Sequence, residues 1–309
     1  MNHPGSHAPS RMVSIGELLW DLLPQGPQLG GAPANVACHA AALGAHAAVI
    51  SRVGPDPLGQ RALEMLRARG LDTRAIEVDA LAPTGTVHVE VDPSGHPRFD
   101  IVRDVAWDRL EASEVALGLV AGADAVCFGT LAQRTPSAQA AVVRLLRSAR
   151  PGTLRVLDIN LRPPFHQDGV IESSLRSADV LKLNEDELPV LARQFQLQGG
   201  PEEQVRGLAT RFGLQAVALT LGARGACLLP SPGGPWLAMP GRSVEVLDAV
   251  GAGDAFTAVL ILGLLGGWSP TDILRRAIDV AAFVCTQPGA TPVLPASPWD
   301  AREKFRERL

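Results

Sequence analysis

The sequence predicts an α/β domain built on a doubly wound, mostly parallel sheet with helices on both faces. Short apolar runs alternate with helix-length segments along most of the 309 residues, as in repeated β-α-β units. Two of these runs, 125–128 and 216–219, contain no polar residue, which is expected of interior strands that helices cover on both sides. A hydrophobic content of 46% supplies a large core and excludes a disordered or fibrous chain.

The predicted elements follow one another in the order that this fold requires. Strands paired with helices are expected at 47–53 and 57–69, 125–129 and 136–148, and 180–183 and 185–195, followed by strands at 216–219 and 226–229, with a strand at 155–159 and a helix at 255–265. One segment departs from this pattern, because 86–91 and 98–102 alternate polar and apolar residues around the turn Asp92–Gly95. This predicts an antiparallel hairpin with one wet face, either an edge decoration or a flap over a site.

Charge and composition exclude several classes of function. The net charge of −4 comes without a run of Lys or Arg, so nucleic acid is not an expected partner. The longest apolar stretch, 256–267, is too short to span a membrane. Residues 1–11 lack a secretory signal and are expected to form a disordered tail, followed by one domain over 12–309 in the cytoplasm. The four cysteines lie far apart and predict reduced core thiols without a metal site.

A phosphate site is predicted where the segment Asp248–Asp254 meets an apolar helix. No Gly-Lys-Ser/Thr loop exists, and Phe256 interrupts a dinucleotide-binding glycine pattern. The small residues Gly251, Ala252 and Gly253 instead let backbone N–H groups converge on an anion at the helix N-terminus. Asp254 would repel a phosphate but suits a proton acceptor for an attacking hydroxyl. An ordinary N-cap on a glycine-rich turn is the alternative.

Three further groups of polar residues lie at predicted strand ends. Thr220, Gly222 and Gly225 form a turn that allows close approach of a ligand or is simply a β-turn. Asn184 and Glu187, three residues apart, could share one helix face and organise hydrated Mg²⁺, or serve only the helix dipole. Asp158, Asn160 and Arg162 alternate with apolar residues, so they emerge on one side, where Arg162 could clamp an anion or form a surface salt bridge.

Taken together and in this order, the motifs resemble the ribokinase-like carbohydrate kinases of the phosphofructokinase-B family, and within it most closely the fructokinases. The resemblance covers about 13–292 and includes blocks at 16–21, 30–37, 54–59 and 105–108. It implies a ribokinase-like fold with a small β lid whose strands are inserted around 18–28 and 84–107. The edge strands of the hairpin would otherwise be exposed pairing templates, which predicts a homodimer formed through that lid.

The resemblance implies a role for each candidate site residue. It places Asp21, Gly30, Gly31, Asn35 and Arg162 at the sugar, and Asn184, Thr220, Gly222, Gly225 and Asp279 at the nucleotide. The anion hole comprises Gly251, Ala252 and Gly253, together with the N–H group of Asp254, which acts as the base. Glu187 would order Mg²⁺ through water, and Asp248 would contribute to a monovalent cation site for K⁺.

The implied activity is transfer of the γ-phosphoryl group of ATP to a hydroxymethyl group of a ketohexose, with fructose as the expected substrate. The alternatives are a kinase for 2-keto-3-deoxygluconate or a nucleoside, and a non-catalytic sugar or nucleotide sensor. The sequence departs from the family pattern at Ala249, where Thr is frequent, at Asp279, where Asn is frequent, and at Phe165–His166, where Trp is common.

Overall fold

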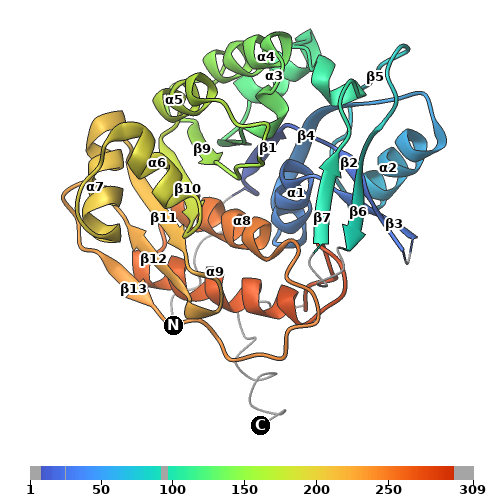
Figure 1. Cartoon of the computed structure of the whole chain (residues 1–309). Helices are drawn as coiled ribbons and strands as arrows, with labels where there is room; N and C mark the ends of the chain where they lie inside the picture. The colour runs from blue at the N-terminus through green and yellow to red at the C-terminus, as the bar shows by residue number, and fades with distance from the viewer. Residues whose placement is uncertain (1–7, 25, 92–96, 296–309) are drawn as a thin grey trace.

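The computed structural model describes residues 8–24, 26–91 and 97–295. Within these residues, nine strands form the main sheet in the order β13-β12-β11-β10-β9-β8-β1-β4-β5 (Figure 1). Every neighbouring pair from β5 to β11 is parallel, whereas β12 and β13 add an antiparallel edge. The predicted doubly wound, mostly parallel sheet is therefore confirmed.

The strands of the main sheet are β1 (Arg11–Ile15), β4 (His46–Val53), β5 (Ile76–Val78), β8 (Ala125–Phe128), β9 (Leu154–Asp158), β10 (Val180–Asn184), β11 (Ala216–Thr220), β12 (Ala226–Leu229) and β13 (Leu237–Met239). The helices are α1 (Ala32–Ala42), α2 (Pro57–Ala68), α3 (Glu114–Ala121), α4 (Pro136–Arg147), α5 (Asp168–Ser177), α6 (Leu188–Phe195), α7 (Pro201–Phe212), α8 (Ala252–Leu265) and α9 (Pro270–Cys285). Short 3₁₀ helices η1 (Ala106–Arg109), η2 (Leu131–Gln133) and η3 (Gly222–Arg224) lie in the connections.

Two apolar cores cover the two faces of the main sheet. One core joins the sheet to α1, α2, α8 and α9, and the other joins it to α3, α4, α5, α6 and α7 (Figure 1). Strands β8 and β11, the two runs without polar residues, are buried along their length up to Thr220. The absence of polar residues in these strands is thus explained by helices on both sides.

Several helices begin where a capping side chain precedes a proline. Asp56, Thr135 and Ser269 accept hydrogen bonds from backbone N–H groups three residues ahead, and each is followed by Pro at the first helical position. A capping oxygen satisfies an otherwise unpaired N–H group, and Pro supplies a helical φ without needing a donor. These local signals set the helix starts independently of the core.

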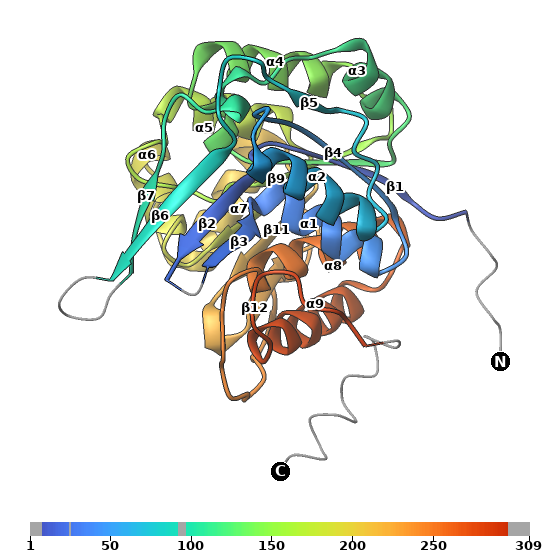
Figure 2. The same cartoon turned by 90° about the vertical axis from the view of Figure 1, so that its right-hand side faces the viewer.

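A second, four-stranded sheet has the order β3-β2-β6-β7. Its strands are β2 (Leu19–Leu23), β3 (Gly26–Gly30), β6 (Gly85–Val91) and β7 (Pro97–Ile101). The antiparallel pairing of β6 with β7 confirms the predicted hairpin, whose turn lies outside the described residues. Val87 is buried and His88 is exposed, as the alternation predicted. The sheet projects from one side of the molecule (Figure 2).

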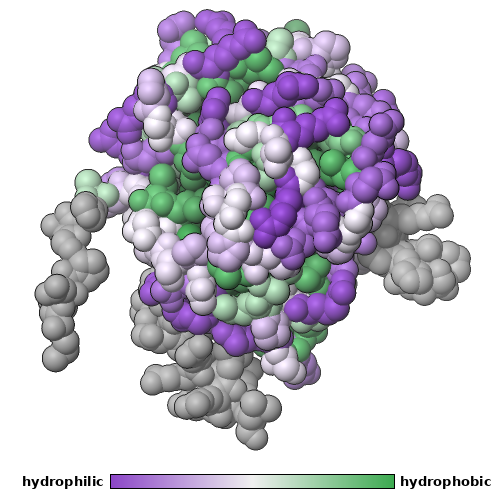
Figure 3. All heavy atoms as spheres, turned by 90° about the vertical axis from the view of Figure 1, so that its left-hand side faces the viewer, coloured by the Kyte–Doolittle hydropathy of each residue, from purple (hydrophilic) through white to green (hydrophobic). Residues whose placement is uncertain are grey.

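The remaining expectations concern the chain ends and the surface. Strand β1 begins at Arg11, the last residue of the expected tail, and residues 1–7 of that tail lie outside the described part of the chain. Among the described residues, no helix is long and apolar enough to cross a membrane. One face of the molecule mixes hydrophilic and hydrophobic residues without a continuous apolar band (Figure 3). All four cysteines are free thiols, and three of them are buried.

Candidate active site

Polar residues, most of them predicted from the sequence, converge on the carboxyl edge of the main sheet. Glu17 follows β1, Asp158 ends β9, Asn184 ends β10 and Thr220 ends β11. Strand β1 lies between β4 and β8, so the sheet is extended in opposite directions from this point. In open α/β sheets, ligands bind at the carboxyl ends of the strands beside such a reversal.

The N-terminus of α8 faces this edge and forms the predicted anion-binding turn. Gly251 is its N-cap, with a φ of 82°, and Ala252, Gly253 and Asp254 form the first turn. A Cβ atom at Gly251 would lie 2.0 Å from the carbonyl oxygen of Ala290, so only glycine fits here. The N–H groups of a first helical turn have no intrahelical acceptor and carry the positive end of the helix dipole. The turn can therefore hold an anion.

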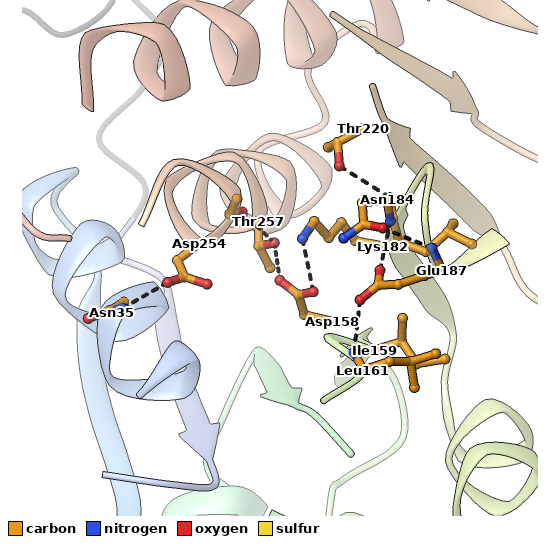
Figure 4. A network of polar contacts seen from close by, with 12 residues as sticks. Asn35, Asp158, Ile159, Leu161, Lys182, Asn184, Glu187, Thr220, Asp254 and Thr257 are labelled. Carbon is orange, nitrogen blue, oxygen red and sulfur yellow. Dashed lines mark hydrogen bonds and ion pairs between the residues drawn. The ribbon is translucent and has the colours of Figure 1, made fainter. Parts of the chain in front are cut away.

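Asp254 lies on this turn, and its side chain is held by α1. The Nδ2 atom of Asn35 donates a hydrogen bond of 2.8 Å to Oδ2 of Asp254 (Figure 4). Burial, together with the charge of Asp158, raises the pKa of Asp254 to about 6. A carboxylate with a pKa near neutrality is suited to accept a proton. Asn35, expected to bind a sugar hydroxyl, thus also orients the predicted base.

Behind Asp254 lies a buried network that the sequence analysis did not identify as functional. Lys182 Nζ donates to Asp158 Oδ1 at 3.0 Å, and Thr257 Oγ1 donates to Asp158 Oδ2 at 2.7 Å (Figure 4). Although burial opposes its charge, Asp158 and Glu187 raise the pKa of Lys182. The sequence did carry a signal, because one of only two lysines in the chain lies in an otherwise apolar strand. The network joins β9 and β10 to α8, the helix that carries the anion-binding turn.

Asn184 and Glu187 lie together, but not on one helix face as expected. Helix α6 begins only at Leu188, and Oδ1 of Asn184 accepts hydrogen bonds from the N–H groups of Asp186 and Glu187. The carboxylate of Glu187 accepts one N–H bond on each oxygen, from Leu161 and from Asn184, both at 2.8 Å. Burial raises the pKa of Glu187, while Lys182 opposes this rise. Each oxygen retains a second lone pair, which suits contact with the water shell of Mg²⁺.

The residues assigned to the sugar surround the base of the four-stranded sheet. A Cβ atom at Gly30 would lie 2.5 Å from Oδ2 of Asp21, and one at Gly31 would lie 2.3 Å from the carbonyl oxygen of Glu17. Burial raises the pKa of Asp21 to about 6, with Arg162 acting in the opposite direction. Arg162 is exposed, and its guanidinium donates a hydrogen bond to the carbonyl oxygen of its neighbour Leu161. The charge of Arg162 therefore acts on the carboxylate of Asp21 and favours its ionised form.

Glu17 is a second residue of this region that the sequence analysis did not single out. Its side chain is 4% exposed, and Oε2 has no hydrogen-bond partner among the described residues. It lines a small cavity together with Asp158 and Asn160. Burial raises the pKa of Glu17 to about 7, although its backbone hydrogen bond and Arg162 favour the charged form. Its burial follows from the fold and left no trace in the local sequence.

The residues assigned to the nucleotide lie farther along the edge. Thr220 ends β11, and Gly222 and Gly225 flank the turn into β12, with φ values of 56° and 103°. Asp279 on α9 is buried and paired with Arg242, so its carboxylate is already engaged within the protein.

Asp248, the residue expected at a monovalent cation site, joins two loops, because its oxygens accept N–H bonds from Val250 and Gly289, both at 3.0 Å.

Comparison with known proteins identifies the family. The model of the pfkB family of carbohydrate kinases matches residues 26–297. Fructokinase from Escherichia coli is 31% identical over 298 residues, covering 91% of this chain and 95% of the relative. 2-Dehydro-3-deoxygluconokinase from Thermoproteus tenax is 30% identical over 316 residues, covering 96% and 94%.

A solved structure of a sugar kinase has the same fold as this chain. An uncharacterized sugar kinase from Pyrococcus horikoshii in complex with ATP superimposes with a TM-score of 0.79 at 30% identity, covering 91% of this chain and 94% of that one. The family match covers most of the chain and includes the anion-binding turn, the Asn184–Glu187 turn and the Asp158–Arg162 segment. The chain is therefore a sugar kinase that belongs to the pfkB family of carbohydrate kinases.

Proposed function

We propose that the protein transfers the γ-phosphoryl group of ATP to a hydroxymethyl group of fructose. The observation that carries this proposal is the position of Asp254, a carboxylate with a pKa of about 6 on the first turn of α8. The hydrogen bond from Asn35 orients it. Among the first-turn N–H groups, that of Ala252 makes a long 3.4 Å hydrogen bond to the carbonyl oxygen of Ala249, and those of Gly253 and Asp254 are left for an anion. A proton acceptor and an anion site are thereby adjacent, as phosphoryl transfer to a hydroxyl requires.

The chain's own residues divide the chemical work between them. The N–H groups of Ala252, Gly253 and Asp254 hold the negative charge on the transferred phosphoryl group, with Gly251 allowing the turn. Asp254 accepts the hydroxyl proton, and Asp21 and Asn35 orient the sugar. Glu187, with Asn184, would order Mg²⁺ through water, and bound Mg²⁺ neutralises phosphate charge. Arg162 adds positive charge on the open side of the site.

Fructose is supported by the blocks at 16–21, 30–37 and 105–108 and by the relationship to Escherichia coli fructokinase. The test is ADP release with MgATP over a panel of ketoses, aldoses, sugar acids and nucleosides. Fructose should give the highest kcat/KM. Background turnover with fructose beside robust turnover with another class would overturn the assignment of substrate, and no ADP release with any acceptor would leave only a sensor.

A sugar-acid kinase is the second candidate, because a specific contact favours it. The guanidinium of Arg103, just after β7, stacks over the ring of Phe165 at 4.9 Å. Phe165 lies three residues after Arg162 on the same loop, so this contact brings Arg103 to the loop that carries Arg162. A sugar carboxylate would use such a pair, whereas fructose does not need it. Turnover of 2-keto-3-deoxygluconate that is lost in Arg103→Gln, with fructose turnover unchanged, would favour this candidate.

The four-stranded sheet supports two further parts of the proposal. We assign it as a lid over the sugar, because β3 ends at Gly30, directly beside the assigned sugar residues. Its edge strands β3 and β7 would otherwise offer unpaired backbone groups, which favours a homodimer formed through the lid. We also assign Asp248 to a monovalent cation site. Titration of KCl into the kinase assay tests this assignment, with Asp248→Asn expected to abolish any stimulation.

A further inference from the structure

Helix α1 carries two buried polar side chains one turn apart. Asn35 is 6% exposed and His39 is 1% exposed. Residues four apart lie on the same face of a helix. Asn35 donates to Asp254, and Nε2 of His39 lies 3.0 Å from the carbonyl oxygen of Ala290. Because a carbonyl can only accept, Nε2 of His39 must carry the hydrogen.

The carbonyl group that His39 holds lies directly against the anion-binding turn. A Cβ atom at Gly251 would lie 2.0 Å from the oxygen of Ala290 and 2.7 Å from its carbonyl carbon. The position of Ala290 therefore limits where Gly251, the N-cap of α8, can lie. The preceding residue, Gly289, donates its N–H group to Asp248 at 3.0 Å. The segment Gly289–Ala290 is thus fastened to the turn through Asp248 and to α1 through His39.

The contact does not depend on a charged imidazole. Burial lowers the pKa of His39 to about 4, with the Ala290 hydrogen bond opposing the fall and nearby Arg69 adding to it. The imidazole is therefore neutral at the pH of a kinase assay. A neutral His39 donates one hydrogen bond from Nε2 and brings no extra charge toward bound phosphates. His39 must therefore act on the anion-binding turn by fixing the position of Ala290 and not by its charge.

We propose that His39 is a positioning residue of the anion hole: it holds Ala290 against Gly251 and so keeps the N–H groups of the first turn of α8 aimed at the transferred phosphoryl group. This inference rests on the proposed function, in which those N–H groups hold that phosphoryl group. A displacement of about 1 Å in a reacting group can cost about 10²-fold in rate. Loss of the His39 contact should therefore lower kcat about 10- to 100-fold.

The test compares variants that break or restore this one hydrogen bond. His39→Leu fills the space but removes the donor, whereas His39→Gln offers an amide N–H near the place of Nε2. Leu66→Ala is the matched control, because Leu66 belongs to the same core on α2 and is fully buried. We expect His39→Leu to lose kcat with little change in sugar KM, and His39→Gln to regain most of it. Leu66→Ala should lower the Tm but leave kcat of the folded enzyme unchanged.

A binding measurement separates this inference from the proposed function. ADP with aluminium fluoride and sugar mimics the transferred phosphoryl group, and its affinity is compared with that of ADP alone. His39→Leu should weaken the first at least 10-fold and leave the second unchanged. If His39→Leu does not fold, His39→Asn replaces it, because asparagine is too short to reach Ala290.

The outcomes are distinguishable. Wild-type kcat and wild-type affinity for the mimic in His39→Leu would overturn the inference while leaving the kinase assignment intact. A parallel loss of kcat in Leu66→Ala would show that only general destabilisation is at work and would also overturn it. If wild-type protein releases no ADP with any acceptor, the proposed function fails. In that case the role of His39 is decided by ligand binding: His39→Leu should bind ATP more weakly than wild type does, with its affinity for ADP unchanged.

Discussion

The substitution Asp254→Asn separates chemistry from stability at the predicted base. Asparagine keeps the size of the side chain, and its carbonyl oxygen can still accept the hydrogen bond from Asn35. The proton acceptor alone is lost. We expect kcat to fall by about 10²- to 10⁴-fold, the usual contribution of a positioned general base, with little change in sugar KM.

The same substitution should stabilise the folded protein above neutral pH. The pKa of Asp254 rises from 3.8 to about 6 in the folded state, so the unfolded state releases its proton first. The favourable contribution of the protonated carboxyl is full below pH 3.8 and is lost as the pH rises through 6. The shift corresponds to up to about 3 kcal/mol, which Asp254→Asn should recover at pH 8.

The assay combines kinetics and thermal melting on one preparation. At pH 8 the variant should melt several degrees above wild type, and the difference should shrink as the pH falls toward 4. The wild-type kcat should fall as the pH drops below about 6, following protonation of Asp254. A variant with wild-type kcat would refute the assignment of the base. A variant that melts below wild type at pH 8 would refute the view that the carboxylate is costly to bury.

Three further predictions address the rest of the site. Lys182→Met leaves Asp158 buried with Thr257 as its one side-chain donor in the described part of the chain, so urea denaturation should show a loss of about 3–5 kcal/mol. A loss below about 1 kcal/mol would contradict the buried ion pair. Gly251→Ala places a Cβ atom against Ala290 at a φ of 82° and should lower both Tm and kcat. The control Gly267→Ala, at a φ of 62° with open space around it, should lower only the Tm. Equal kcat values in the two variants would refute the steric argument. Hydrogen exchange in β6 and β7 should slow when sugar binds, and the mass in solution should be that of a dimer; unchanged exchange and a monomeric mass would remove both the lid and the dimer.

Most of the fold could be predicted because its signals are local. An apolar run such as 125–128 indicates a strand wherever it occurs, and Thr135 followed by Pro136 marks a helix start. Strand β3 was not predicted from its residues, because Gly-Pro-Gln-Leu-Gly has little strand propensity. Only the family resemblance implied lid strands in that part of the chain. Tertiary pairing with β2 overrides the local preference.

The site was predicted less completely, since its parts lie far apart in the sequence. Asp254 follows a recognisable glycine turn, but Thr257 and Asp158 are separated by 99 positions and meet only in the folded chain. A local sequence pattern indicates which face of a helix or strand is apolar, but it does not indicate how deeply a single polar side chain is buried. The burial of Glu17 and His39 therefore could not be inferred. The same limit explains Asp279, whose partner Arg242 lies in a different segment.

The chain between β1 and α1, which carries β2 and β3 of the four-stranded sheet, begins and ends at a glycine. The chain leaves β1 at Gly16, with a φ of 154°, and re-enters at Gly31, with a φ of 107°. A Cβ atom at Gly16 would lie 2.6 Å from Pro33, and one at Gly31 would lie 2.3 Å from the oxygen of Glu17. The N–H group of Asn35 donates to the carbonyl oxygen of Gly31 at 3.0 Å.

Strand β3 therefore passes into α1 through Gly31 alone, with no loop between the sheet and the helix. We expect a tilt of β2 and β3 to reach Asn35, whose side chain donates to Asp254, within one helical turn of Gly31. Under the proposed function, we therefore expect closure of the sheet over the sugar and alignment of Asp254 to be coupled in one movement.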